Sequence, residues 1–162
     1  MIETNENKNY KSNQNEQENA DTSNKTKTNS RNIHIRDDAG ELFVITKCKD
    51  LSLYVFTVTA KSPKHFRYTL IAKMHSLCLD LIDNLYSANS VLIKKGEEEK
   101  HKKRLDYQIK ALNIIRMLEY TAEIAFKQQC IIKKQYMNIG KLGAECTILL
   151  NNWIASDKRR VE

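Results

Sequence analysis

Four apolar stripes at helical spacing, each about 20 to 28 residues long, fill residues 42–158 of this chain. Apolar residues that recur every three or four positions form one face of an amphipathic helix. Four such helices with short connections can bury their stripes in only a few ways, chiefly as an antiparallel bundle. The sequence therefore predicts an all-α fold, an antiparallel up-down four-helix bundle.

Capping and turn residues set the limits of the expected helices. Ser62 is expected to cap the second helix, because serine caps well and Pro63 suits the first helical position. A dense charge run with Gly96 predicts an exposed loop over residues 94–101. The four helices are predicted over residues 41–61, 63–93, 102–129 and 133–157.

The first of these helices has conflicting signals. Residues 54–59 are β-branched and aromatic, which is typical of a strand. Periodicity favours a helix, because five apolar residues are spaced three or four apart. They are Val44, Cys48, Leu51, Val55 and Val58. We predict a helix here, preceded by a turn over residues 37–40 in which Asp37 or Asp38 caps the first turn.

The amino-terminal segment differs from the rest in composition. Residues 1–32 contain nine asparagines and four apolar residues, too few to offset the entropy of ordering the segment. A disordered tail and linker is therefore expected over residues 1–40, a bundle over 41–158 and a basic end over 159–162. The chain has no signal-peptide pattern and no run of 18 apolar residues. It is expected to be cytoplasmic and to have no contact with a membrane.

The formal net charge of +7 is unevenly distributed. The tail holds as many acidic as basic residues, so the whole surplus lies on the helical part. A surplus of this size on a small domain favours polyanionic partners. Ordinary solubilising charge is the alternative.

The third helix has an unusually broad apolar arc. It includes Leu105, Ile109, Leu112, Ile115 and Leu118, and it covers more of the circumference than one bundle normally buries. The excess predicts a second buried contact between subunits, whereas a central helix with generous packing is the alternative. In the fourth helix, Gly140 and Gly143 predict a close helix–helix approach, because glycine within a helix costs about 1 kcal/mol relative to alanine.

Patterns for catalysis are missing from the sequence. The four histidines have no spacing that would hold a metal on one helix face, and no phosphate-binding loop or nucleophile elbow occurs. The four cysteines are isolated, and Cys78 and Cys146 fall on apolar faces, as buried reduced thiols do. We therefore expect no enzymatic activity, no metal and no cofactor.

The basic residues are the best candidates for a binding site. Phosphate contacts by lysine and arginine give affinity that does not depend on sequence and falls with salt. Phe66 and Tyr68, next to Arg67, suit a base or ribose contact, although packing is the alternative for both. The candidate nucleic-acid-binding residues are Lys64, His65, Arg67, Lys73, Arg104, Lys110, Lys133, Lys134 and Lys141. For any single lysine, solubility is the simpler explanation.

Arg116 falls within the predicted apolar stripe of the third helix. Glu119 and Glu123 lie on the same helix face, three and seven residues further on. A buried charge persists only when it is paired. We therefore expect Arg116 to form an ion pair within the bundle or with a neighbouring subunit.

Several stretches resemble a known family. These are residues 62–70, 79–89, 104–107 and 139–154, within a likeness that covers about residues 42–158. The pattern resembles the four-helix-bundle family that contains the accessory variability determinant proteins of diversity-generating retroelements. The same family includes the bundle proteins encoded in ribosomal RNA intervening sequences.

The resemblance implies a ring of five bundles with a basic outer surface. Such a pentamer binds the template RNA of the retroelement and its reverse transcriptase, and supports mutagenic cDNA synthesis without any activity of its own. The basic positions that match are Lys64, Arg67, Lys73, Arg104 and Lys110. A protein-only oligomeric scaffold and a ribosomal intervening-sequence protein remain the alternatives.

Overall fold

The computed structural model describes residues 37–162, with side chains from Phe43 onward. The predicted tail, residues 1–36, lies outside the described residues. The elements are α1 (Asp37–Thr59), α2 (Lys64–Phe66), the π-helical turn η1 (Arg67–Ile71), α3 (Ala72–Ser90), α4 (Glu98–Lys127) and α5 (Lys133–Val161). No strand occurs between residues 37 and 162, so the all-α prediction is confirmed.

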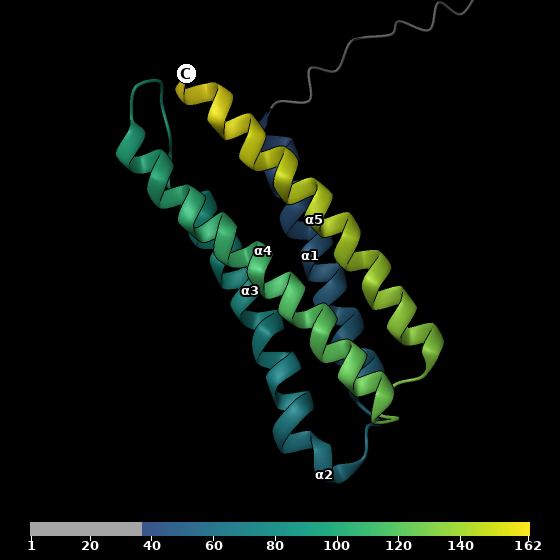
Figure 1. Ribbon diagram of the computed structural model, residues 1–162. Coiled ribbons are helices and arrows are strands. Elements are labelled where there is room, and N and C mark those ends of the chain that lie inside the picture. Colours follow the sequence, from purple (N-terminus) through teal and green to yellow (C-terminus); the bar gives the residue numbers. More distant parts are fainter. Residues whose placement is uncertain (1–36) are drawn as a thin grey trace, which may run out of the picture. The chain divides into compact units, whose positions relative to one another are not determined.

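The four long helices pack around one hydrophobic core (Figure 1). Helix α1 packs against α3 and α5, and α4 packs against the same two helices. The connection from α1 to α2 and the connection from α4 to α5 lie at one end of the helices, which we call the α2 end. The loop from α3 to α4 lies at the opposite end, together with the carboxyl terminus.

Helix α1 continues through the β-branched segment to Thr59, as the apolar periodicity predicts. Val44, Cys48, Leu51 and Val55 are at most 2% exposed. The hydroxyl group of Thr59 donates to the carbonyl of Val55 at 2.7 Å, and Thr57 bonds Leu53 in the same way at 2.8 Å. Burial of a continuous apolar seam therefore outweighs the intrinsic strand preference of these residues.

Several details at the helix boundaries differ from the prediction. Helix α4 begins at Glu98 rather than Lys102, so residues 98–101 of the predicted loop are helical. Helix α1 begins at Asp37, so the turn expected over residues 37–40 is helical. Ser62 does not cap the second helix, because its hydroxyl group donates instead to the Cys130 carbonyl at 3.1 Å. The second helical segment contains a π turn and ends at Ser90 rather than Ile93.

In the first half of α4 the buried face lies one position before the predicted stripe, whereas Ile115 and Leu118 are buried as predicted. Ile109 is 44% exposed, and Leu105 and Leu112 are only half-buried. The buried residues of α4 are Arg104, Gln108, Ala111, Ile115, Leu118, Thr121, Ala122 and Ala125. These buried residues also recur every three or four positions, but the first two are polar. A pattern of apolar residues alone therefore misses the start of this buried face.

The two glycines of α5 have different surroundings. A β-carbon on Gly143 would lie 2.5 Å from Oε1 of Glu119 on α4, so the close approach predicted here is confirmed. A β-carbon on Gly140 would have nothing within 4 Å, so the same prediction is wrong for Gly140. Burial against α5 raises the pKa of the Glu119 carboxyl group, and nearby Arg116 partly offsets this effect.

Candidate nucleic-acid interface

Two segments are the longest stretches of the chain without an acidic residue. Neither residues 51–79 nor residues 124–144 contain any Asp or Glu. Together they contain eight cations, namely Lys61, Lys64, Arg67, Lys73, Lys127, Lys133, Lys134 and Lys141. The first segment ends α1 and begins α3, whereas the second ends α4 and begins α5.

The fold joins these two segments at the α2 end. The hydroxyl group of Ser62, in the first connection, donates to the carbonyl of Cys130 in the second at 3.1 Å. Both groups are buried, since Ser62 is 1% and Cys130 is 7% exposed. The backbone at Gln129 adopts a left-handed conformation with φ of 56°, which ends α4 and turns the chain toward this contact.

The first connection places three of the predicted residues on the surface. Lys64, His65 and Arg67 are all exposed. Nε of Arg67 donates to the Ser62 carbonyl at 3.2 Å, which holds the guanidinium group close to the connection. The side chain of Arg67 is exposed, and the remaining donors of its guanidinium group are suited to phosphate oxygens.

The second connection contributes Lys133 and Lys134, which open α5 and are exposed. The side-chain amide of Gln135 accepts a hydrogen bond from the backbone N–H of Ile132 at 2.9 Å and so fixes the start of this helix. Lys64, His65, Arg67, Lys133 and Lys134 therefore occupy one end of the helical unit, although they lie about 70 residues apart in sequence.

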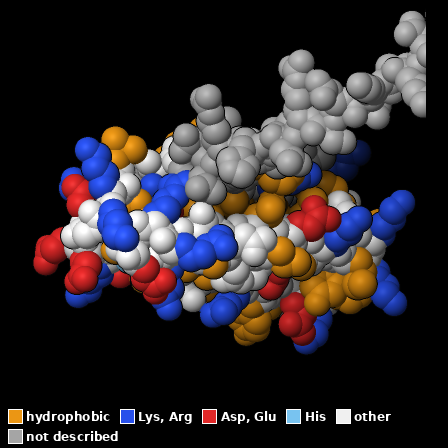
Figure 2. All heavy atoms as spheres, turned by 90° about the horizontal axis from the view of Figure 1, so that it is seen from above, with side chains coloured by type: hydrophobic (Ala, Val, Ile, Leu, Met, Phe, Trp, Pro, Cys, Tyr) orange, Lys and Arg blue, Asp and Glu red, His pale blue; other side chains and the backbone are white. Residues whose placement is uncertain are grey.

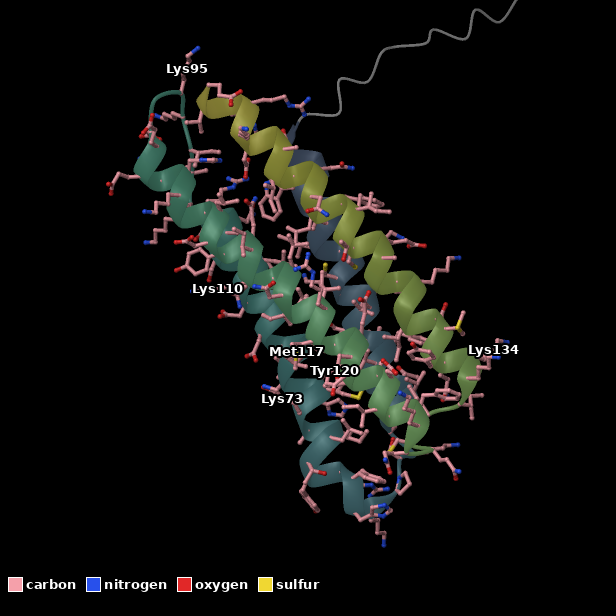
Figure 3. The ribbon with its side chains drawn as sticks, in the orientation of Figure 1. Lys73, Lys95, Lys110, Met117, Tyr120 and Lys134 are labelled. Carbon is pink, nitrogen blue, oxygen red and sulfur yellow. The ribbon has the colours of Figure 1, made fainter. Side chains whose placement is uncertain are left out.

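Three predicted residues are exposed but lie outside this cluster. Lys73 is the second residue of α3, two positions after the end of η1. Lys110 lies on α4, where its ammonium group is 5.4 Å from the centre of the Tyr107 ring, and Lys141 lies two turns into α5. Figure 3 shows Lys73, Lys110 and Lys134 on different helices, well separated in the view. The predicted set is therefore not one continuous patch.

The interpretation of Arg104 as a nucleic-acid contact is wrong. Its side chain is only 2% exposed, and Nε lies 2.8 Å from Oδ2 of the buried Asp157. Nη1 donates to the Val91 carbonyl at 3.1 Å, and the guanidinium group lies 4.9 Å from the centre of the Trp153 ring. Arg104 therefore stabilises the fold at the end opposite to α2.

The prediction of a buried Arg116 is also wrong, because Arg116 is exposed. Arg116 shares a helix face with Leu105 and Ile109, and that face is half-buried at Leu105 and exposed at Ile109. Glu123 pairs with Lys127 at 2.6 Å on the surface, and Glu119 is half-buried against Gly143. The buried arginine of this helix is Arg104.

Sequence reasoning missed Lys61, Lys127 and the role of Ser62. Lys61 and Lys127 are exposed, and each directly adjoins one of the two connections that meet. The absence of acidic residues from both segments can be recognised in the sequence alone. Its meaning depends on the contact between the connections, which no local pattern reveals.

The opposite end has mixed charge. Figure 2 views the helical unit from that side and shows acidic side chains interspersed with basic ones. Glu97, for example, binds Lys100 at 2.7 Å and also accepts a hydrogen bond from the Lys94 backbone at 2.9 Å. These carboxylates neutralise part of the lysine charge at this end.

Neither titrating side chains nor metal ligands form a catalytic arrangement in the described part of the chain. His75 stacks on Phe56 with ring centres 4.1 Å apart and bonds the Thr59 hydroxyl group at 2.8 Å, and burial lowers its pKa. Burial raises the pKa of the Cys78 thiol to about 11, so this cysteine stays protonated at neutral pH. Within residues 37–162, no group of His, Cys, Asp or Glu is arranged to hold a metal.

Comparison with other proteins identifies no relative. No family model, curated protein or solved structure matches the chain. Among the described helices, none combines the length and the apolar composition that a membrane span requires.

Proposed function

We propose that this protein is a non-catalytic nucleic-acid-binding protein that holds RNA at the α2 end. The observation that carries the proposal is the meeting of two acid-free segments, which gathers exposed lysines and Arg67 at one end of the helical unit. Six of the eight cations of these segments lie next to the two connections, in a chain whose net charge is +7. Charge of one sign concentrated in this way raises the local potential and attracts a polyanion.

The expected mode of binding is electrostatic. Each phosphate that a lysine or arginine neutralises releases counterions from the nucleic acid, so the affinity falls steeply as salt rises. Lys64, Lys133 and Lys134 are suited to this role, because none of them has an ion pair within the described residues that must be broken first, whereas Lys127 pairs with Glu123. The carboxylates at the opposite end make that end a poorer site for RNA.

We further propose the biological setting that the family resemblance implies. In that setting the protein is the accessory factor of a diversity-generating retroelement, and it binds template RNA and the reverse transcriptase to support mutagenic cDNA synthesis. The four helices would form an antiparallel up-down bundle, and several copies, as many as five, would form a homo-oligomer. The all-helical fold and the basic α2 end support this proposal.

A protein-only oligomeric scaffold is the second candidate, and exposed apolar residues favour it. Leu53 on α1 is 69% exposed and Leu79 on α3 is 64% exposed. Helix α1 contacts α3 through the hydrogen bond of Lys49 with Tyr86 and through the stacking of Phe56 on His75. Leu53 lies between Lys49 and Phe56 on α1, and Leu79 lies between His75 and Tyr86 on α3. Leu53 and Leu79 therefore present an apolar surface on neighbouring helices, which we call the α1–α3 patch, and such surfaces mark protein contacts.

Salt-dependent RNA binding tests the proposed function. The full-length protein is titrated into a fluorescently labelled structured RNA at about 50 and about 200 mM salt. Wild-type affinity should fall by at least an order of magnitude over this range. The variant Lys64→Glu, Lys133→Glu, Lys134→Glu should lose binding while its circular dichroism spectrum remains helical.

The matched control reverses three exposed lysines at the opposite end, Lys102→Glu, Lys103→Glu and Lys158→Glu. It changes the net charge equally and should retain most of the affinity. Equal losses in the two variants would reject the α2 end as the site. A wild-type protein that fails to bind RNA at low salt would favour the protein-only scaffold.

A further inference from the structure

Tyr68 is the most exposed large hydrophobic residue among the described residues. It is 91% exposed and lies in η1, within the first acid-free segment. Within the described residues it has neither a hydrogen bond nor a ring contact. Folding therefore gains little from this ring, and its whole face is available to a partner.

The π turn determines what surrounds Tyr68. The backbone N–H of Ala72 donates to the carbonyl of Arg67, five residues earlier, so this turn holds one residue more than an α-helical turn. Lys64 precedes Tyr68 by four residues, one turn away on the same side. The additional residue rotates Lys73 back toward that side. Tyr68 therefore lies between two exposed lysines of the same helical segment.

The neighbouring rings are already engaged. Phe66 is partly buried and packs on the core, and the ring of His65 lies 4.1 Å from it at an angle of 48°. Phe66 therefore anchors the segment, and Tyr68 is the aromatic residue that remains free. The hydrogen bond from Arg67 to the Ser62 carbonyl, 3.2 Å long, also restrains the segment next to Tyr68.

We propose that Tyr68 stacks on an unpaired base, so that the α2 end binds single-stranded RNA more tightly than duplex. This inference rests on the proposed function and names its ligand class. Sites for single strands combine cations that follow the phosphates with aromatic rings on which bases stack. Lys64 and Lys73 would contact phosphates on either side of the base that lies on Tyr68.

A duplex cannot use this ring in the same way. Its bases are already stacked on one another, and the major groove of an RNA helix is too deep and narrow for side chains to reach them. The lysines would still contact duplex phosphates. Removal of the Tyr68 ring should therefore affect single strands selectively, whereas removal of a lysine should affect both forms.

The test compares two RNA ligands on the full-length protein by fluorescence anisotropy. One is an unstructured single strand, and the other is a duplex of the same sequence, both measured at low salt. Tyr68→Ala should weaken single-strand binding about tenfold and change duplex binding less than about twofold. Tyr68→Phe should retain wild-type affinity for both, since it keeps the ring. Tyr86→Ala, at an exposed tyrosine of α3 outside the acid-free segment, is the control and should change neither.

The outcomes separate this inference from the proposed function. Loss of single-strand binding in Tyr68→Ala, with Tyr68→Phe unaffected, supports base stacking. A Tyr68→Ala variant that binds both ligands like the wild type, or loses both equally, overturns the inference but leaves electrostatic RNA binding intact. A wild-type protein that binds neither ligand overturns both. Because Tyr68 is almost fully exposed, none of these variants should unfold the protein.

Discussion

Nε of Arg104 lies 2.8 Å from Oδ2 of Asp157, and the two side chains are 2% and 0% exposed. This ion pair joins the first turns of α4 to the last turns of α5. Nε2 of Gln108 donates to the same carboxylate oxygen at 2.7 Å, and Arg104 also binds the carbonyl of Val91. The pair therefore fixes the loop between α3 and α4 as well as the two helices.

Removal of one partner of this pair should strongly destabilise the fold. Asp157→Asn leaves the Arg104 charge buried without its carboxylate, which typically costs about 3–5 kcal/mol. Urea unfolding followed by circular dichroism measures the change. Glu123→Gln is the control, because its surface pair with Lys127 should contribute less than about 1 kcal/mol. Equal free energies of unfolding for the two variants would show that the buried charge of Arg104 does not require the Asp157 carboxylate.

The two glycines of α5 should respond differently to alanine. Gly140→Ala should raise the free energy of unfolding by about 1 kcal/mol, because the site is open and alanine favours a helix. Gly143→Ala should raise the free energy of unfolding by less, because the new β-carbon would displace the Glu119 carboxylate. In a Glu119→Ala background, Gly143→Ala should recover the gain. A full gain from Gly143→Ala alone would contradict the close approach.

Stability should fall in mild acid because of His75. Burial lowers the pKa of His75 below its ordinary value of 6.5, so the unfolded chain binds a proton more readily than the folded one. The free energy of unfolding should therefore decrease as pH falls from about 6.5 toward the lower folded-state pKa. Urea unfolding at about pH 7.5 and 5.5 measures this decrease. His75→Gln should show a smaller decrease than the wild type, and an equal decrease would exclude His75 as its source.

The α1–α3 patch should mediate self-association. Light scattering of the wild-type protein should give a mass several times the monomer's 18.9 kDa. Leu53→Lys, Leu79→Lys should shift the protein toward the monomer, because lysine at either position places charge in the buried contact. Leu92→Lys, at an exposed leucine in the loop from α3 to α4, should leave the mass unchanged. A monomeric wild type would remove the support for an oligomer.

Apolar periodicity predicts the four long helices well. The seam from Val44 to Val55 gives α1 despite its strand-like composition, and Gly143 reveals the contact with α4. Periodicity gives the wrong face only for the first half of α4, because the buried seam begins with Arg104 and Gln108, which an apolar pattern omits. Arg116 and Ile109 were consequently placed inside, whereas the structure exposes both.

The candidate site depends more strongly on tertiary structure. The lysines next to each connection are evident in the sequence, but their proximity results from the Ser62–Cys130 hydrogen bond between segments far apart in the chain. The π turn that presents Tyr68 likewise has no sequence signature in this segment. Charge composition thus predicts the class of partner, and the fold determines where that partner can bind.

Ultraviolet crosslinking of the full-length protein to RNA, followed by mass spectrometry of the linked peptides, tests the central claim most directly. The linked residues should fall within residues 61–73 and 127–141, the parts of the two acid-free segments nearest the connections that meet at the α2 end. Crosslinks confined to residues 94–103 and 158–162, at the opposite end, would contradict the account.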